Sequence, residues 1–308
     1  MNIITLTPNP AFDLHCYTES FAPYHENVFE ITARDAGGKG INVSRALMKN
    51  GVKNTAACIV GCENGGEFLK MLERDGLTLA AVQVEGRIRE NITLHEKEKD
   101  ETRISFPGFS CDPSVLKELR AAMGKLDEET VCVFAGSAPA GISEEALVAF
   151  LKDLKAEGAS LIIDSRSVSL ASLEELHPML IKPNREEAER ALGISIQTLQ
   201  DAKNAAKALQ EKGMENVLLS LGGKGAILAS AEGVYHAETP KIEVLSTIGA
   251  GDSTIAGFLS AMAEGCSKPL SLARAVVFGS AACLSEGTAP PKPEDVKKLL
   301  QEISVNAI

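Results

Sequence analysis

Apolar residues are distributed along the chain in two alternating patterns. In the first they form short continuous runs, which predict strands that are buried on both faces of a sheet. In the second they recur every three or four positions, which predicts helices with one apolar face. The predicted strands are residues 3–6, 55–60, 131–135, 161–164, 179–182 and 217–221. The predicted helices are residues 41–50, 65–75, 113–124, 143–157, 185–192, 199–212 and 253–263.

The alternation of strand and helix predicts the α/β class, with a doubly wound and mostly parallel sheet. Ligands of such sheets bind at the carboxyl ends of the strands, so the segments that follow the strands become candidate sites. We interpret the 308 residues as one domain, residues 1–308, that is long enough to bury a large core.

Two stretches, residues 15–34 and 87–106, interrupt this alternation because polar and β-prone residues replace the helical periodicity. In the second stretch Ile92, Leu94 and Glu96 predict one strand of a hairpin, with residues 97–101 as its charged turn. We predict that both stretches form a small β-sheet lid, made by residues 14–35 and 87–107. Irregular insertions are the alternative interpretation.

Composition and charge exclude several classes of function. A net charge of −11 argues against a nucleic-acid partner, which would require a clustered basic surface. No apolar run is long enough to predict a membrane span. The first residues enter a predicted strand without a charged leader, so we expect a cytoplasmic protein. The seven cysteines include no Cys-x-x-Cys pair, which is typical of reduced thiols.

The most informative motif is Gly249-Ala250-Gly251-Asp252, which lies between a β-prone run at 242–245 and a predicted helix. Backbone N–H groups of Gly249, Ala250 and Gly251 at a helix N-terminus would hold an anion. A carboxylate is unfavourable beside a simple anion site. A carboxylate in this position is instead suited to act as a base, which takes the proton of a hydroxyl group as that hydroxyl attacks a phosphoryl group. The motif therefore predicts a phosphotransferase with Asp252 as its base.

A second glycine-rich segment, residues 36–43, precedes another predicted helix. Its glycines, Gly38 among them, allow close approach of a ligand to the backbone. Lys39 would contact a phosphate, and Asn42 would contact sugar hydroxyls. The spacing is neither that of a Walker loop nor that of a dinucleotide-binding turn. A structural turn is the alternative.

Two further motifs follow predicted strands. One predicts either a hairpin turn or a backbone wall against a nucleotide, and comprises Ser220, Gly222, Gly223, Lys224 and Gly225. In the other, Asn184 and Glu187 have the spacing of a helix capping box. The alternative for this pair is that it holds hydrated Mg²⁺, a cation that prefers few protein carboxylates.

The remaining candidates lie after the first strand, in the lid and after the strand at 131–135. Asp13 would accept hydrogen bonds from sugar hydroxyls, or would be a surface residue. Arg89 and Asn91 would reach a substrate phosphate from the lid, although an arginine on a strand is often a solvated edge charge. Ser137 lies in a Gly-Ser-Ala-Pro-Ala-Gly turn that would border the site.

Together these segments resemble the ribokinase/PfkB family of carbohydrate kinases. The matching motifs, in the order of the family, are Thr-x-Asn-Pro-x-x-Asp at 7–13, Gly-Gly-Lys-Gly-Ile-Asn at 37–42, Arg-x-Asn at 89–91, Gly-Ser-x-Pro-x-Gly at 136–141, Lys-Pro-Asn-x-x-Glu at 182–187, Ser-Leu-Gly-x-x-Gly at 220–225 and Gly-Ala-Gly-Asp at 249–252. The first three resemble the phosphosugar branch, which contains 1-phosphofructokinases and tagatose-6-phosphate kinases.

The resemblance implies a Rossmann-like, ribokinase-like domain with a β-lid, which pairs with a second copy in many members. It implies transfer of a phosphoryl group from ATP, with Mg²⁺, to a ketohexose phosphate, foremost fructose 1-phosphate to fructose 1,6-bisphosphate. By this resemblance Asp252 is the base and Gly249 to Gly251 form the anion hole. Asp13, Gly38, Asn42 and Arg89 orient the sugar phosphate. The nucleotide lies along residues 220–225, and Asn184 with Glu187 organises Mg²⁺.

Two departures from the family pattern bear on the substrate. Ala138 replaces the leucine of the Gly-Ser-Leu-Pro turn, which we expect to alter packing more than chemistry. Residues 26–29 lack the lysine that 6-phosphofructokinases of the family carry there, which disfavours fructose 6-phosphate. Tagatose 6-phosphate stays open. So do a kinase for an unphosphorylated sugar or nucleoside and a non-catalytic sugar-phosphate sensor on the same scaffold.

Overall fold

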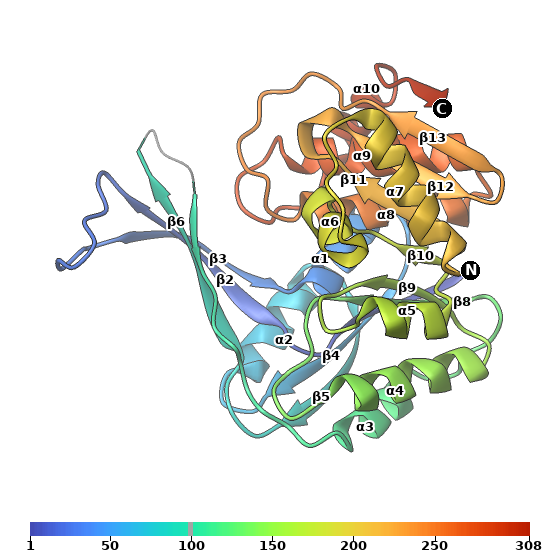
Figure 1. The fold of residues 1–308 in the computed structure, drawn as a ribbon. Coiled ribbons are helices and arrows are strands. Elements are labelled where there is room, and N and C mark those ends of the chain that lie inside the picture. Colours follow the sequence, from blue (N-terminus) through green and yellow to red (C-terminus); the bar gives the residue numbers. More distant parts are fainter. Residues whose placement is uncertain (98–100) are drawn as a thin grey trace.

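A computed structural model describes residues 1–97 and 101–308. Its main feature is a ten-stranded sheet in the order β14-β13-β12-β11-β10-β9-β8-β1-β4-β5 (Figure 1). The strands from β5 to β11 in this order are parallel, and β12 to β14 extend the sheet as antiparallel strands. The strands are β1 Asn2–Thr7, β4 Thr55–Gly61, β5 Thr78–Val84, β8 Thr130–Ala135, β9 Ser160–Asp164, β10 Leu180–Ile181, β11 Asn216–Ser220, β12 Ala226–Ser230, β13 Gly233–Ala237 and β14 Val305–Ala307.

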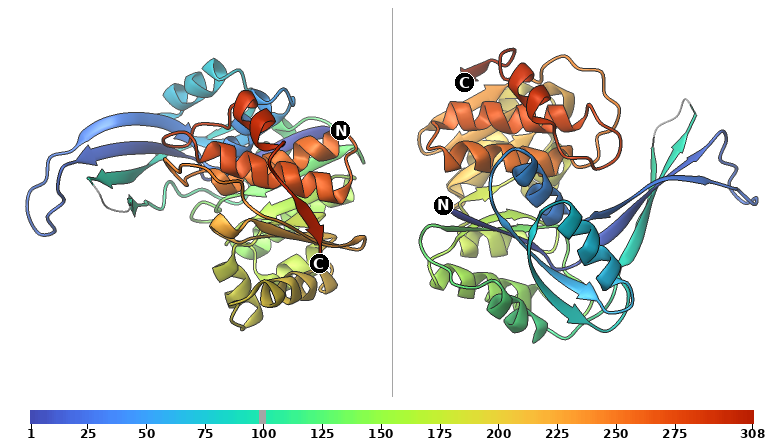
Figure 2. Two further views of the ribbon diagram at one scale, coloured as in Figure 1. Left: turned by 90° about the horizontal axis from the view of Figure 1, so that it is seen from above. Right: turned by 180° about the vertical axis from the view of Figure 1, so that it is seen from behind.

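Helices cover both faces of this sheet (Figure 2). Alternate residues of a strand point to opposite faces, so Val133 and Phe134 of β8 enter separate apolar clusters. One cluster includes residues of α1, α8 and α9, and the other clusters include residues of α3, α4, α6 and α7. The helices are α1 Lys39–Lys49, α2 Gly65–Arg74, α3 Val115–Ala122, α4 Glu144–Ala156, α5 Leu170–Leu176, α6 Arg185–Leu192, α7 Leu199–Glu211, α8 Ala250–Ala263, α9 Lys268–Ala282 and α10 Pro293–Leu299. The predicted α/β class and its doubly wound sheet are confirmed.

The β-prone run at 242–245 does not form a strand. It forms a loop in which Val244 and Leu245 are exposed. The Leu245 N–H donates to the carbonyl of Cys283 at 2.9 Å instead of to a neighbouring strand. The helix that follows also begins at Ala250, three residues earlier than predicted, because Gly249 takes the left-handed conformation that precedes its first turn.

A small four-stranded sheet stands out from one side of the molecule (Figure 1). Its order is β3-β2-β6-β7, and its strands are β2 Ala11–Thr18, β3 Glu30–Gly37, β6 Arg89–Glu96 and β7 Thr102–Ile104. The two stretches that interrupt the helical periodicity therefore pair with each other, as predicted for a separate sheet. The predicted hairpin is formed by β6 and β7, while residues 98–100 of its turn lie outside the described residues.

All seven cysteines are free thiols, in keeping with their spacing. Within the described ranges, no helix has both the length and the apolar character needed to cross a bilayer.

Candidate active site

The candidate site lies where the carboxyl ends of central strands meet the N-termini of α1 and α8. Gly249 precedes α8 with a φ of 75°, a conformation that glycine adopts without steric cost. The first regular helical hydrogen bond is donated by the Ser253 N–H to the Gly249 carbonyl at 2.9 Å. The Ala250 N–H makes a longer bond of 3.4 Å to the carbonyl of Thr247. The open end of α8 therefore presents backbone N–H groups and a positive dipole end.

Asp252 lies in the first turn of α8 and is 6% exposed. Its Oδ2 atom accepts a 2.8 Å hydrogen bond from Nδ2 of Asn42, which lies on α1. These two predicted site residues are 210 positions apart in the sequence. The Oδ1 atom of Asn42 is buried and has no partner within the described part of the chain. Asn42 therefore orients the carboxylate with its amide group and leaves an acceptor for a further hydroxyl.

Two lysines share a buried carboxylate beside Asp252, and this arrangement was missed in the sequence. Asp164, the last residue of β9, is 5% exposed. Its Oδ2 lies 3.0 Å from Nζ of Lys39 and 3.7 Å from Nζ of Lys182. The Lys182 amine also lies close to α8, because a Cβ placed on Gly251 would be 3.1 Å from it. Positive charge therefore collects at the open end of α8.

The carboxylates of Asp164 and Asp252 differ in their proton affinity. Burial raises the pKa of Asp252 to about 6, with a further contribution from the charge of Asp164, while Lys39 acts in the opposite direction. Burial also acts to raise the pKa of Asp164, but the two lysines outweigh it and lower that pKa below its usual value. Asp164 is therefore a permanent anion, and Asp252 can accept and release a proton near neutral pH.

The predicted acceptor side lies where the small sheet joins the large one. Asp13 on β2 and Asn91 on β6 are register partners, and the Asn91 amide donates to the Asp13 carboxylate at 3.2 Å. Asp13 is 5% exposed, and its carboxylate rests against the backbone of Gly37. Burial raises its pKa, although the Asn91 hydrogen bond and nearby cations lower it in part.

Arg89 lies on the same strand, beside Asn91, but its guanidinium group has protein partners. It donates to the carbonyl of Phe106 at 2.9 Å and to the carbonyl of Asn9 at 3.1 Å. Asn9 in turn donates to the hydroxyl of Ser137 at 3.3 Å. Arg89 therefore connects the small sheet to the loop after β1. Asn9 was part of a matched motif but was not singled out among the predicted site residues.

Gly38 brings the start of α1 close to the loop after β1. Its φ is 122°, and a Cβ on this residue would be only 2.7 Å from Cγ2 of Thr7. A larger residue would push α1 away from β1 and would displace Lys39 and Asn42 with it. Glycine is therefore required at position 38 by the packing of α1 against β1, and the groups of this motif that can contact a ligand are the side chains of Lys39 and Asn42.

Asn184 and Glu187 form the capping box that their spacing predicts at the start of α6. The Glu187 N–H donates to Asn184 Oδ1 at 2.9 Å, and the Asn184 N–H donates to Glu187 Oε2 at 3.1 Å. The other Glu187 oxygen accepts from Arg166 Nε at 3.2 Å. Asn184 also pairs with Ser220, so two predicted nucleotide-side motifs lie side by side.

The glycine motif after β11 forms the hairpin turn to β12, as its simpler interpretation predicts. Gly222 to Lys224 make one turn of 3₁₀-helix. Gly225 has a φ of 90° and passes so close to Ala237 that a Cβ would lie 1.8 Å from its carbonyl oxygen. Gly222 and Gly223 have open space where their Cβ atoms would be. The turn thus presents bare backbone on its outer side.

No group of three or more His, Cys, Asp or Glu side chains arranged to hold a metal occurs in residues 1–97 and 101–308. Asp164 and Glu187 do line a common cavity of about 220 Å³ at the ends of β9 and β10. A cation here would have few protein ligands and would need ligands from water or phosphate. The same cavity is lined by Arg166, Lys182 and Arg190, so this donor set fits Mg²⁺ only together with waters and the phosphates of a bound nucleotide.

Comparison with known proteins relates the chain to one family, to two of its bacterial members and to a solved structure. The model of the pfkB family carbohydrate kinases matches residues 10–295. The 1-phosphofructokinase of Escherichia coli strain K12 is 34% identical over 280 residues, covering 89% of each chain. That of Bacillus subtilis strain 168 is 34% identical over 310 residues, covering 99% of this chain and 100% of its own. The crystal structure of phosphofructokinase-2 from E. coli in complex with substrates and products superimposes with a TM-score of 0.90 at 27% identity, covering 98% of this chain and 99% of that one.

Proposed function

The chain belongs to the pfkB family of carbohydrate kinases, and from this we propose that it is a sugar-phosphate kinase that converts fructose 1-phosphate to fructose 1,6-bisphosphate with ATP. Both bacterial relatives at 34% identity are 1-phosphofructokinases. The observation that carries the catalytic part of the proposal is the buried Asp252 carboxylate at the open end of α8, oriented by Asn42. This is the arrangement required of a base beside a phosphoryl group.

In the proposed reaction Asp252 takes the proton of the acceptor hydroxyl. The acceptor oxygen forms its bond to the γ-phosphorus of ATP as the bond to the β,γ-bridging oxygen breaks, and ADP leaves. With a pKa of about 6, Asp252 is mostly ionised at neutral pH. Its carboxylate is also more basic than an ordinary aspartate, so it can accept the proton that the acceptor hydroxyl releases in the reaction. The unpartnered Oδ1 of Asn42 would accept a hydrogen bond from the sugar.

Negative charge on the transferring group would be offset by the N–H groups at the N-terminus of α8 and by Lys39 and Lys182. The proximity of both lysines to Asp252, through their shared partner Asp164, supports this role. Asp164 would hold the two amines in place and would prevent either of them from pairing permanently with the base. Because this charge is already in position before the reaction, little reorganisation is needed at the transition state.

The nucleotide would lie against the bare backbone of Gly222 and Gly223, with Ser220, Lys224 and Gly225 completing that wall. Mg²⁺ would be held through water by Glu187 and Asn184 and would neutralise charge on the phosphates. The cavity shared by Glu187 and Asp164 supports this assignment. Both oxygens of Glu187 already accept hydrogen bonds, which favours contact through water over direct ligation.

The sugar phosphate would bind under the small sheet, which we propose acts as a lid on the domain formed by residues 1–308. Asp13 would bind sugar hydroxyls, with Gly38 leaving room beside it. Arg89 would meet the phosphate that the substrate already carries, and Asn91 would hold Asp13 in place. Ser137, linked to Arg89 through Asn9, would complete this side of the site.

The lid is also the proposed contact surface of a homodimer. Its outer part carries exposed apolar side chains, which include Tyr24, Val28, Ile31, Ile104 and Phe106. Several exposed apolar side chains grouped on a small sheet are typical of a surface that a partner covers. The edge strand β3 lies among them, and its free edge is a place where a second copy would pair.

A substrate panel tests the proposed activity. Purified protein is assayed with ATP and Mg²⁺ against fructose 1-phosphate, fructose 6-phosphate, tagatose 6-phosphate and free fructose. We expect kcat/KM to be highest for fructose 1-phosphate, by at least about tenfold. A site built to bind a phosphate disfavours sugars that lack the phosphate or carry it on a different carbon, because its polar groups are then left unpaired. A preference for tagatose 6-phosphate or fructose 6-phosphate would refute the substrate assignment. ADP release without any phosphosugar dependence would refute the reaction.

A further inference from the structure

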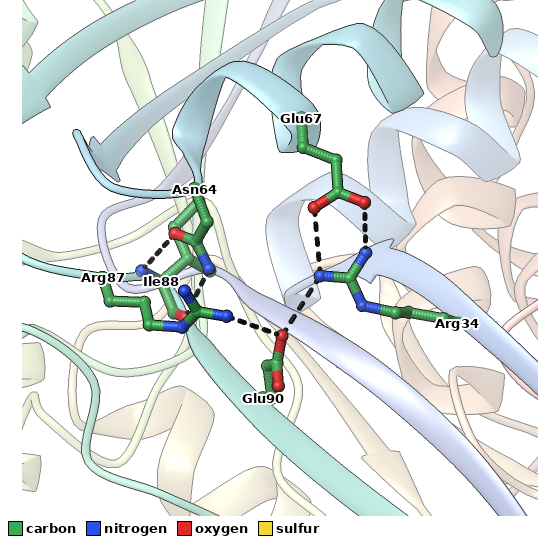
Figure 3. Close-up of polar contacts among 6 residues, drawn as sticks. All are labelled: Arg34, Asn64, Glu67, Arg87, Ile88 and Glu90. Carbon is green, nitrogen blue, oxygen red and sulfur yellow. Dashed lines mark hydrogen bonds and ion pairs between the residues drawn. The ribbon is translucent and has the colours of Figure 1, made fainter. Parts of the chain in front are cut away.

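The start of α2 contacts the chain at two places, where it leaves the small sheet along β3 and where it enters this sheet again before β6 (Figure 3). Asn64, which precedes α2, makes two hydrogen bonds to the backbone of Ile88, of 2.8 and 3.1 Å, just before β6 begins. Glu67, one turn later, forms an ion pair with Arg34 of β3. Residues three apart on a helix lie on the same side of it, so one turn at the start of α2 contacts both β3 and the residue before β6.

Arg34 has more directional partners than an ordinary surface arginine. Nη1 lies 2.6 Å from Glu67 Oε1, and Nη2 lies 3.3 Å from Glu67 Oε2 and 3.1 Å from Glu90 Oε1. Its guanidinium carbon also lies 3.7 Å from the centroid of the Phe12 ring. Isolated surface ion pairs contribute little to stability, but a bidentate pair that is also stacked on a ring fixes an orientation.

These groups lie directly behind the residues that face the proposed sugar site. Successive side chains of a strand point to opposite faces. Phe12 therefore faces away from Asp13 on β2, and Glu90 faces away from its neighbours Arg89 and Asn91 on β6. On β3, Arg34 precedes Asp35, which is the register partner of Asp13. The ion pairs of Arg34 with Glu67 and Glu90, which we call the clamp, therefore lie on the back of the strands whose front carries the proposed sugar-binding groups.

The clamp is also connected to Asp13 through the backbone of β3 and to the core through α2. Gly37, three residues after Arg34, is the point at which the Asp13 carboxylate touches β3. Beneath Arg34, Phe12 packs edge-to-face against Phe68 of α2, with ring centroids 5.2 Å apart. A shift of β3 relative to α2 would therefore change the position of Asp13 relative to the large sheet.

We propose that Arg34 is a positioning residue for the sugar phosphate. Its clamp on Glu67 and Glu90 sets the tilt of the lid strands, and so the placement of Asp13, Arg89 and Asn91 over Asp252. This inference rests on the proposed function in so far as the lid binds the substrate. The buried Asn64 contact serves as the fixed pivot, while the half-exposed Glu67 contact sets the angle.

The variants Glu67→Gln and Arg34→Met, with the double variant, test this proposal. Glu157→Gln is the matched control, because it removes the carboxylate of a comparable two-pronged pair with Arg120 that lies away from the lid. Kinetics are measured on whichever substrate of the panel the unmodified protein uses best, so a wrong substrate assignment does not affect the comparison. Both single variants should raise KM for the phosphosugar about three- to tenfold and leave kcat and KM for ATP within about twofold.

The double variant should be no worse than Arg34→Met alone, because Arg34→Met already removes the contact with Glu67 together with the contacts to Glu90 and Phe12. Three results would overturn the proposal: additive increases of KM in the double variant, an unchanged KM for the phosphosugar in the single variants, or an equal increase of KM in Glu157→Gln. Amide hydrogen exchange of the ligand-free proteins provides a readout that needs no turnover. Residues 11–18 and 89–96 should exchange several-fold faster in Glu67→Gln and Arg34→Met than in the control. Equal exchange rates would also overturn it, whether or not the proposed activity is correct.

Discussion

At the scale of single residues, Asp164 organises the charges around the proposed base. It pairs with Lys39 and Lys182, and its negative charge contributes to the raised pKa of Asp252. A buried carboxylate between two lysines is favourable only because both partners are present. The distinction between Asp164 and Asp252 thus comes from their surroundings, since both are aspartates that are almost fully buried.

Asp164→Asn should move the acid limb of the kcat/KM profile to lower pH. In the unmodified protein Asp252 must be ionised to act as a base, so activity falls below pH 6 or so. Removal of the Asp164 charge lowers the pKa of Asp252 and leaves both lysines to lower it further. We also expect kcat to fall on the order of 10- to 100-fold, because the lysines lose their anchor. Steady-state assays between pH 5 and 8 measure both effects.

Asp153→Asn, a change of an exposed aspartate on α4, is the control for this prediction. It should leave both the limb and kcat unchanged. An acid limb that stays in place or moves to higher pH in Asp164→Asn would contradict the charge arrangement described above. A pH profile is informative here because simple loss of folded protein lowers activity at every pH without moving the limb.

The predicted site residues came from motifs, and the structure shows which parts of the site motifs can reveal. Gly38, Asn42 and Asp252 stand in glycine-rich turns, whose composition is unusual enough to be noticed. Asp164 stands at the end of an apolar strand, where a charged residue is ordinary, and Lys182, although it opens the matched motif at 182–187, was not singled out for the same reason. The contact between Asn42 and Asp252 spans 210 positions and follows only from the order of strands in the sheet.

At the scale of elements, regular periodicity and capping residues were the reliable signals. Helix α6 has the predicted bounds, because its capping box and terminal glycine mark both ends. Helix α9, Lys268–Ala282, was not predicted, because it is buried around almost its whole circumference and has no polar face. The loop at 242–245 has β-prone residues, but Val244 and Leu245 are exposed and the Leu245 N–H is bound by the carbonyl of Cys283. Tertiary position overrode local preference in both cases.

At the scale of the whole molecule, the proposed homodimer follows from the exposed apolar part of the lid. Sedimentation equilibrium at micromolar concentration should give twice the mass of the 32.6 kDa chain. Val28→Asp with Ile31→Asp should shift the mass toward that of the monomer, because charges placed in a buried interface disfavour association. Ile194→Asp, at an exposed apolar residue outside the lid, should leave the mass unchanged. A monomer in the unmodified protein would contradict the dimer.

The whole molecule brings together two halves of a site that are far apart in the sequence. Residues up to position 107 supply the lid, the start of α1 and Lys39, and residues after position 163 supply Asp164, Lys182, the base and the nucleotide wall. The two sets meet because β1, from the N-terminal part of the chain, lies inside the sheet between β8 and β4. The proposed reaction at this meeting point therefore depends on Asp252 acting as the base.

The turnover number of Asp252→Asn with ATP, Mg²⁺ and fructose 1-phosphate tests that claim most directly. The amide retains an oxygen that can accept from Asn42, but it cannot take a proton. Because the folded-state pKa of Asp252 is raised, the carboxylate destabilises the folded state above its unfolded pKa. The variant should then be more stable than the unmodified protein at pH 7.5, by up to about 3 kcal/mol, with the difference vanishing below about pH 4. We expect kcat to fall about 10²- to 10⁴-fold in this well-folded variant. A kcat within about tenfold of the unmodified protein would contradict the assignment of Asp252 as the base.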